Sequence, residues 1–257
     1  MNSCIVFTNW KMNKTLAETE EFFTRLVKLH GDRKDLELIM CIPSLYIRAV
    51  ATSCNGTCIR IGSENMYPGD WGAYTGETSA PMLKSVGCEI ALIGHSERRK
   101  FFHEDDELVG KKLKSALDHG LFPIACIGET REERDAGQMF AVLARQVEIC
   151  FQCLTPDSRL YIAYEPRWAI GAGIIPEYPQ IEEAHRFIRE EIVKRYGTAV
   201  SDNIRLLYGG SVSPQNSFAI CSLEHVDGVG YGGCSLDLDC LSRGIEESVR
   251  AFQASSS

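Results

Sequence analysis

The sequence predicts an α/β protein in which eight parallel strands, each followed by a helix, close into a (β/α)8 barrel. Short β-rich apolar runs alternate about eight times with longer amphipathic runs, and this alternation is typical of a parallel sheet with helical crossovers. Eight repeats allow the sheet to close on itself. A chain of 257 residues has the usual size of one such barrel. No linker or low-complexity segment divides it, so we expect a single catalytic domain over residues 1–257.

The strands are expected to begin where runs of β-branched and aromatic residues begin. The predicted first residues are Cys4, Leu36, Ile59, Glu89, Leu121, Arg159, Ile204 and His225. Apolar residues at helical spacing predict helices between them, for example over residues 16–29 and 182–196. Residues 254–257 are small and are expected to fray. An open doubly wound sheet is the structural alternative, but its glycine-rich dinucleotide fingerprint is missing after the first strand.

Composition and charge exclude several classes of partner. A formal net charge of −8 and a pI of about 5.3 disfavour nucleic acid, whose binders usually have a basic stripe. No apolar run approaches the roughly twenty residues needed to cross a bilayer, and no signal-peptide pattern begins the chain. We therefore expect a soluble, cytoplasmic protein without nucleic-acid or membrane partners. Any anionic ligand must be held by a local arrangement of donors.

The eleven cysteines are scattered through apolar segments. A chain of this length does not need a disulfide framework, so most of them are expected to be reduced core residues. Cys54 with Cys58 and Cys150 with Cys153 could together form a four-sulfur zinc site, but nothing brings the two pairs together. We expect no metal. An oxidation-sensitive thiol is the favoured alternative.

Several segments contain the residue types of a proton-transfer site. Residues 163–173 join an apolar strand end to one carboxylate, Glu165, and then to a glycine-rich loop, while His95 stands between Gly94 and a run of charged residues. Asn9 and Lys11 follow the first strand. Taken singly, each is more often an ordinary solvated or hydrogen-bonded residue. In a parallel barrel, however, the carboxyl ends of the strands meet on one face, so these side chains are expected to converge.

These motifs, over residues 5–250, resemble the triosephosphate isomerase family. The resemblance implies a TIM barrel that interconverts dihydroxyacetone phosphate and D-glyceraldehyde 3-phosphate through an enediolate. Glu165 would then transfer the proton, Lys11 and His95 would stabilise the negative charge, and Asn9 and Glu97 would complete the catalytic set. A neutral histidine at a helix start is an established feature of this family. No cofactor is required, and a glycolytic and gluconeogenic role is implied.

The resemblance places the substrate phosphate among glycine-bearing loops that follow the late strands. The expected phosphate-binding residues are Gly171, Ser211, Gly232 and Gly233. Backbone N–H groups and a helix N-terminus can supply positive potential there without a basic protein. A Gly-Gly pair by itself is more often a tight turn.

By the same resemblance, residues 166–176 form a lid over the substrate, which protects the enediolate from loss of its phosphate. The implied lid and latch residues are Pro166, Trp168, Gly173, Pro176, Tyr208 and Glu129, with Ser211 as a further latch. Glu129 is the expected partner of Trp168 in the open state. Arg167, Ala172 and Pro176 depart from the family pattern. Because Pro176 has no backbone N–H, we expect the Tyr208 latch to be rewired or lost, and closure to depend more on Ser211 and on the stiffness of Pro176.

The aromatic-rich loop of residues 65–77 indicates a homodimer, because in the family this loop enters a pocket of a second subunit. Thr75 is expected to reach toward Asn9 and Lys11, and Glu77 and Arg98 to pair across the interface. Glu64 replaces the glutamine that is usual in the family.

Two functional alternatives remain at this point. One is a paralogous isomerase of a four-carbon ketose phosphate, such as an erythrulose phosphate, which the altered lid hinge leaves possible. The other is a barrel that only binds phosphate ligands. A base opposite two electrophilic groups argues against a mere binder.

Overall fold

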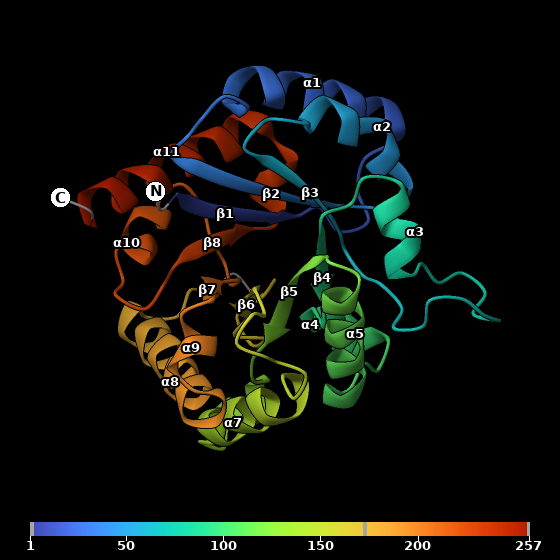
Figure 1. The fold of residues 1–257 in the computed structure, drawn as a ribbon. Coiled ribbons are helices and arrows are strands. Elements are labelled where there is room, and N and C mark those ends of the chain that lie inside the picture. The colour runs from blue at the N-terminus through green and yellow to red at the C-terminus, as the bar shows by residue number, and fades with distance from the viewer. Residues whose placement is uncertain (1–2, 172–173, 256–257) are drawn as a thin grey trace.

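The computed structural model, which describes residues 3–171 and 174–255, contains a closed barrel of eight parallel strands (Figure 1). The strands are β1 (Cys4–Asn9), β2 (Leu36–Ile42), β3 (Ile59–Ser63), β4 (Ile90–Ile93), β5 (Phe122–Ile127), β6 (Leu160–Tyr164), β7 (Ile204–Tyr208) and β8 (Gly228–Tyr231). They follow one another around the barrel in chain order, and β8 closes it by pairing with β1. The predicted fold class is confirmed, and the open sheet is excluded.

Helices form an outer ring around the strands (Figure 1). The α-helices are α1 (Leu16–His30), α2 (Ile47–Ala51), α3 (Ala80–Ser85), α4 (Ser96–Phe101), α5 (Asp106–Asp118), α6 (Arg131–Asp135), α7 (Met139–Cys150), α8 (Tyr178–Tyr196), α9 (Thr198–Ser201), α10 (Ser217–Cys221) and α11 (Leu238–Ser255). Three 3₁₀ turns are η1 (Ser44–Tyr46), η2 (Thr52–Cys54) and η3 (Gly233–Leu236). In Figure 1, α1 and α2 lie on one side of the barrel, and α7, α8 and α9 lie on the opposite side.

Local sequence explains where these elements begin and end. Thr15 and Glu18 form a reciprocal capping box at the start of α1. Most predicted strand starts agree with the structure to within one residue, but β8 begins at Gly228 instead of His225. The reason is that the side chain of Asp227 accepts the backbone N–H of Leu206 at 2.7 Å and so replaces the ladder bond there. Residues 254 and 255 continue α11 instead of fraying, and residues 256 and 257 lie outside the described residues.

Alternation along the strands divides the apolar core into two shells. In β1, Ile5 and Phe7 point into the barrel, whereas Cys4 and Val6 pack against the surrounding helices. Residues from the other strands complete the interior shell: Ile39, Cys41, Ile90, Leu92, Ile124, Cys126, Tyr161, Ala163 and Leu207. The barrel is therefore a filled core, and ligands must bind at its ends.

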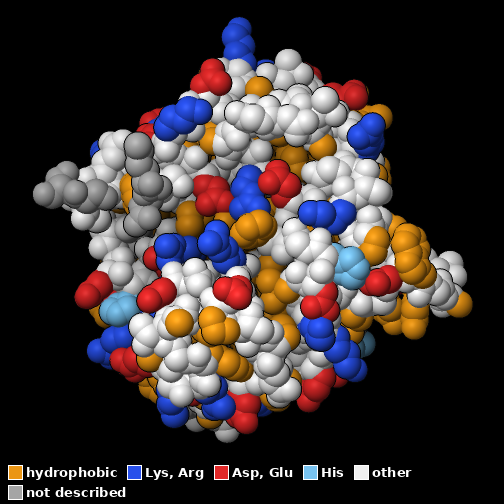
Figure 2. Space-filling view, in the orientation of Figure 1, with side chains coloured by type: hydrophobic (Ala, Val, Ile, Leu, Met, Phe, Trp, Pro, Cys, Tyr) orange, Lys and Arg blue, Asp and Glu red, His pale blue; other side chains and the backbone are white. Residues whose placement is uncertain are grey.

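One segment of the surface stands away from the barrel. The chain between β3 and α3 projects outward (Figure 1), and Figure 2 shows hydrophobic side chains along this projection. Within it, Trp71 is 70% exposed and Tyr74 is 49% exposed. Elsewhere, none of the helices in the described ranges combines the length and apolar character required to span a bilayer.

Candidate active site

The end of β1 positions Lys11 in an unusual backbone conformation. Lys11 has a φ of 56°, and its backbone N–H donates to Asn9 Oδ1 at 3.0 Å. A left-handed residue other than glycine typically costs about 1–3 kcal/mol, and such strain clusters at functional sites. The Lys11 ammonium lies 2.7 Å from Glu97 Oε1. The strained turn therefore directs the lysine side chain across the barrel mouth toward the residues that follow β4.

His95 is the N-cap residue of α4, with φ −50° and ψ 144°. Its Nδ1 accepts the backbone N–H of Glu97 at 3.2 Å, so we assign the proton of the neutral ring to Nε2. Nε2 lies 3.3 Å from Glu165 Oε1. The local fold thus aims an imidazole donor toward the carboxylate that follows β6.

Glu165 follows β6 and is only 3% exposed. Its Oε2 accepts the backbone N–H of Ser96 at 2.9 Å, while Oε1 faces His95. A Cβ atom at Gly128 would lie 1.8 Å from the carbonyl oxygen of Glu165, so only glycine lets the loop after β5 pass this close. The structure therefore holds a buried carboxylate with one oxygen bound and the other directed at an imidazole.

Two neighbouring cavities open around these groups. The larger, of about 420 Å³, is lined by Lys11, Ser96 and Glu97 together with the lid residues Arg167, Trp168 and Gly171. The smaller, of about 320 Å³, is lined by Asn9, Lys11, Glu64, His95 and Glu97. Lys11 and Glu97 line both cavities, and Asn9 and His95 line the smaller one. The buried Glu165 lines neither cavity and is joined to the site by its contacts with His95 and Ser96. This space suits a small molecule that carries a carbonyl group.

Gly232 and Gly233, which follow β8, offer unused donors. Among the described residues, neither of their backbone N–H groups meets a hydrogen-bond acceptor. A Cβ atom added to either glycine would meet nothing within 4 Å, so both face free space. Such paired N–H groups can hold an anion. Ser211, which follows β7, donates from Oγ to the carbonyl oxygen of Ala169 in the lid at 3.2 Å, and Gly171 has a φ of 71°.

The first part of the lid is anchored on Glu129. This fully buried carboxylate accepts the Trp168 Nε1–H at 2.8 Å and the Tyr164 hydroxyl at 3.2 Å. Arg134 lies 3.2 Å from the same oxygen. The buried Pro166 accepts the N–H of Ala169 at 2.8 Å through its carbonyl oxygen. Glu129 therefore anchors the start of the segment that follows β6.

The remaining residues expected in the lid and latch are Gly173, Pro176 and Tyr208. Gly173 lies outside the described residues. Pro176 is buried, and the hydroxyl of Tyr208 is buried without a hydrogen-bond partner in residues 3–171 and 174–255. Burial raises the pKa of this hydroxyl, so it remains a neutral donor. An unpaired hydroxyl is what the missing N–H of Pro176 leads us to expect.

The residues expected at a dimer interface occupy two surfaces of the chain. Thr75 and Glu77 are exposed on the projecting loop. Arg98 lies on α4, where its guanidinium is hydrogen-bonded to Glu104 and stacks 4.5 Å from the ring of Phe102. Within one chain, therefore, Arg98 already has a carboxylate partner other than Glu77.

Sequence reasoning missed three features near this site. It did not anticipate that the Ser96 N–H holds Glu165, although Ser96 lies within the recognised motif. It did not find the disulfide between Cys234 and Cys240, for which the only signal was two cysteines flanking a short segment after Gly232 and Gly233. It noted that Glu64 replaces the glutamine usual in the family, but it did not predict that the Glu64 carboxyl group is buried. Burial raises the Glu64 pKa to about 8, and the charge of Glu97 adds to the effect.

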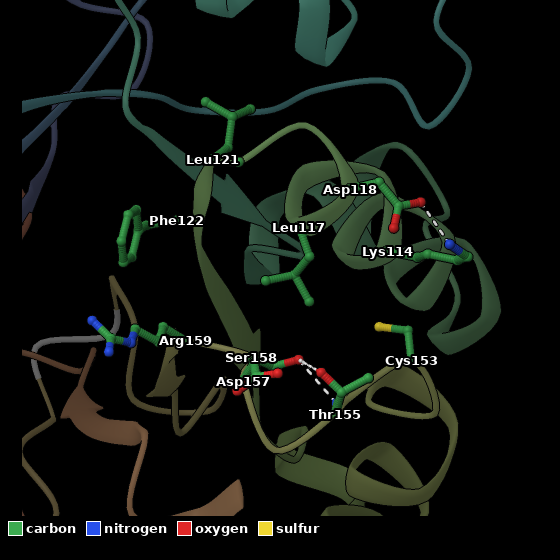
Figure 3. Close-up of a pocket in the computed structure, with 11 residues that line it drawn as sticks. Lys114, Leu117, Asp118, Leu121, Phe122, Cys153, Thr155, Asp157, Ser158 and Arg159 are labelled. Carbon is green, nitrogen blue, oxygen red and sulfur yellow. Dashed lines mark hydrogen bonds and ion pairs between the residues drawn. The ribbon is translucent and has the colours of Figure 1, made fainter.

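Other groups were considered as ligand or metal sites. Among the described residues, Glu182, Glu224 and His225 are the one group of side chains that could hold a metal ion. They lie on α8 and before β8, and His225 Nδ1 is already hydrogen-bonded to Glu182. Another cavity, of about 350 Å³, lies at the amino ends of β5 and β6 (Figure 3). Its Lys114 and Asp118 pair with each other at 2.6 Å, and it contains no histidine. The first place has no lysine in the group, and the second has no histidine, so neither repeats the set of Lys11, His95 and Glu165.

At the carboxyl ends of its strands this parallel barrel brings together a buried carboxylate, an imidazole donor and an ammonium group. These are the groups of an enzyme class, the isomerases that move a proton beside a carbonyl. A family model described as triosephosphate isomerase matches residues 4–248. The chain belongs to the triosephosphate isomerase family.

Similar proteins named triosephosphate isomerase occur in several bacteria. The protein of Alkaliphilus metalliredigens is 42% identical over 243 residues, which are 94% of this chain and 98% of the relative. The protein of Dictyoglomus thermophilum is 41% identical, over 92% of this chain and 96% of the relative. That of Symbiobacterium thermophilum is 41% identical, over 92% and 93% respectively. The chain is accordingly an aldose–ketose isomerase that interconverts dihydroxyacetone phosphate and D-glyceraldehyde 3-phosphate, a glycolytic reaction.

Proposed function

We propose that Glu165, His95 and Lys11 perform this isomerisation within a single catalytic domain. The observation that carries the assignment is the geometry of the carboxylate: Glu165 Oε1 lies 3.3 Å from His95 Nε2, and His95 lines the same cavity as Lys11. A base within reach of a hydrogen-bond donor is the arrangement that proton transfer beside a carbonyl requires.

In this proposal, Glu165 removes a proton from the carbon of dihydroxyacetone phosphate that carries the free hydroxyl group. The electrons of that C–H bond form the enediolate, and its negative oxygen is stabilised by the Lys11 ammonium and the His95 Nε2–H. Glu165 then returns the proton to the neighbouring carbon, while His95 Nε2 passes a proton from the first substrate oxygen to the second, and the two transfers together give the aldose. Asn9 orients the Lys11 backbone, and Glu97 pairs with the Lys11 ammonium while its N–H fixes the His95 tautomer.

The substrate phosphate would lie against Gly232 and Gly233, with Gly171 and Ser211 closing over it from the lid and the loop after β7. The support is that both backbone N–H groups lack an acceptor among the described residues and that a Cβ atom at either glycine would meet nothing within 4 Å. Backbone donors explain how a chain of net charge −8 can hold a dianion. The lid formed by residues 166–176 would turn about the contacts of Trp168 with Glu129 and exclude water from the enediolate.

We further propose that the enzyme is a homodimer. The exposed aromatic side chains on the projecting loop are unusual for a monomer surface. The cavity that holds Asn9, Lys11 and His95 is rimmed by Met12, which is 96% exposed, and by Phe102, which is 63% exposed. This apolar rim suits the loop of a second subunit, with Thr75 reaching Asn9 and Lys11. The setting we propose is the cytoplasm, where glycolysis and gluconeogenesis share this reaction.

The test is Glu165→Gln, which keeps the shape of the side chain but removes the base. We expect kcat to fall by about 10² to 10⁴, whereas Glu183→Gln, at an exposed position of α8, should leave it unchanged. A kcat for Glu165→Gln within a few fold of the parent would reject the assignment. The same assay should give a higher kcat/KM for glyceraldehyde 3-phosphate than for erythrulose phosphates.

A further inference from the structure

A disulfide lies directly behind the proposed phosphate loop. Cys234 in η3 is bonded to Cys240 in the first turn of α11, six residues further along the chain. Both residues are partly exposed. The bond therefore closes a short loop of chain that solvent-borne thiols can reach.

The closed loop is hydrogen-bonded to the phosphate loop. Ser235, which lies between the two cysteines, donates both its backbone N–H, at 2.9 Å, and its Oγ–H, at 2.6 Å, to the carbonyl oxygen of Gly232. These two bonds fix the peptide unit that joins Gly232 to Gly233, and with it the direction of the Gly233 N–H. Any loosening of the segment between the cysteines must therefore loosen this donor.

The same segment is tied to the turn that carries Lys11. The indole Nε1–H of Trp10 donates to the Ser235 carbonyl oxygen at 3.2 Å, and the Lys14 ammonium donates to the Leu236 carbonyl oxygen at 2.9 Å. Trp10 is fully buried, so this side of the segment has a fixed support. The part of the segment that can still move is Gly233 with Cys234, and the disulfide restrains this part.

The remaining nine cysteines are free, and six of them are buried and therefore less suited to reversible oxidation. Burial raises the pKa of Cys54 and of Cys88 to about 11 and that of Cys150 to about 12. The thiolate is the reactive form, so buried thiols of this kind react slowly near neutral pH. The partly exposed pair behind the phosphate loop is the place where a redox change would act on the site.

We propose that Cys234 and Cys240 form a reversible thiol–disulfide site that sets the affinity of the enzyme for the substrate phosphate. A low-molecular-weight thiol attacks one sulfur of the disulfide to give a mixed disulfide and one free cysteine. A second thiol releases the other cysteine, so the protein gains two electrons and two protons and the reductant becomes a disulfide. Disulfides of cytoplasmic proteins are usually transient in this way.

The oxidised form should bind phosphate more tightly. The bond restricts the short segment that positions the Gly233 N–H, and a donor fixed before binding loses less conformational freedom when the anion arrives. On reduction we expect KM to rise about three- to tenfold and kcat to change by less than about twofold, since a phosphate contact serves substrate and transition state alike. This inference rests on the proposed role of Gly232 and Gly233.

The experiment compares enzyme oxidised by glutathione disulfide with enzyme reduced by dithiothreitol, with the reagents removed before assay. Thiol titration of the denatured protein should find nine free thiols in the first and eleven in the second, and peptide mapping should locate the difference at Cys234 and Cys240. The inhibition constant of inorganic phosphate should rise with KM on reduction. Cys240→Ser should show the reduced values under both conditions, and the control Cys153→Ser should respond like the parent.

Equal phosphate inhibition constants in forms with nine and eleven thiols would overturn the proposal, as would a Cys240→Ser enzyme that still responds to reduction. The comparison of phosphate inhibition constants uses only the parent enzyme, so it decides the question even if Cys240→Ser does not fold. An enzyme inactive on triose phosphates in both states would contradict the proposed function instead.

Discussion

The backbone N–H of Glu97 points at Nδ1 of His95 from 3.2 Å. An acceptor at Nδ1 cannot carry a proton, so the single proton of the neutral ring lies on Nε2, the atom 3.3 Å from Glu165 Oε1. A doubly protonated ring would set two donors against each other at the start of α4. The helix start thus favours the tautomer whose Nε2–H donates toward Glu165.

Nitrogen-15 NMR of histidine-labelled enzyme near neutral pH should show this tautomer directly, with a proton on Nε2 of His95 and none on Nδ1. His95→Gln should lower kcat by about 10² or more, because one preorganised donor to an oxyanion has that effect. The control is His103→Asn at an exposed residue with φ 55°, a conformation that asparagine tolerates. A proton found on Nδ1 would contradict the assignment.

The fold could be predicted from the sequence because its signals are local and repeated. Alternating apolar runs placed seven of the eight strand starts within one residue, and parallel closure then required Lys11, His95 and Glu165 to meet at one end. The predicted start of β8 was wrong because the side chain of Asp227 accepts the backbone N–H of Leu206 in place of a bond between the two strands. Such an exchange between side chain and backbone leaves no periodic signal.

The missing parts of the site depend on contacts between distant segments. The backbone N–H of Ser96 donates to Glu165, which lies 69 residues further along the chain. Every residue except proline has a backbone N–H, so the residue type at this position does not indicate the bond. The raised pKa of Glu64 depends on its burial and on the charge of Glu97, which lies 33 residues further along the chain. The disulfide of Cys234 with Cys240 requires the turn of η3 to reverse the chain, which the spacing of two cysteines does not specify.

The two tyrosines near the lid should respond in opposite ways to loss of their hydroxyl groups. The Tyr164 hydroxyl is bonded to Glu129, whereas that of Tyr208 is buried without a partner among the described residues. Tyr164→Phe leaves a buried carboxylate short of one donor and should cost about 1–3 kcal/mol in the free energy of unfolding. Tyr208→Phe should leave that free energy unchanged or raise it.

Steady-state kinetics test whether the Tyr208 hydroxyl takes part in closing the lid. If Pro176 has removed the partner of Tyr208, kcat of Tyr208→Phe should stay within about threefold of the parent, while closure relies on Ser211. Urea unfolding and steady-state assays of both variants measure the two effects. A fall in kcat of tenfold or more for Tyr208→Phe would show that its hydroxyl still acts as a latch.

Glu64 should make the stability of the protein depend on pH. Burial raises its pKa from 4.5 to about 8, and one of its oxygens is buried without a hydrogen-bond partner among the described residues. Between these two values the folded chain binds the proton and the unfolded chain does not. The stabilisation is therefore complete below pH 4.5 and is lost as pH rises through about 8, at up to about 1.4 kcal/mol per pH unit.

Glu64→Gln removes this titration while keeping the size of the side chain. The variant should be more stable than the parent at pH 8 to 9, and the difference should shrink toward pH 5. Thermal unfolding across this pH range measures it, with Glu89→Gln as the control because Glu89 is exposed. Parallel curves for parent and Glu64→Gln would mean that Glu64 does not hold a proton in the folded state.

Activity should depend on pairing of two chains through the projecting loop. If Thr75 enters the cavity of a second subunit, the parent should sediment at twice its chain mass of 28.6 kDa. Thr75→Arg places a charge where an apolar rim closes around the loop, so this variant should sediment as a single chain. Its kcat should fall by tenfold or more, because Lys11 loses a contact that holds its strained turn. Thr24→Arg makes the same chemical change on the exposed face of α1 and should alter neither property. A Thr75→Arg enzyme that is monomeric and fully active would show that each barrel completes its own site, and a dimeric one would place the interface elsewhere.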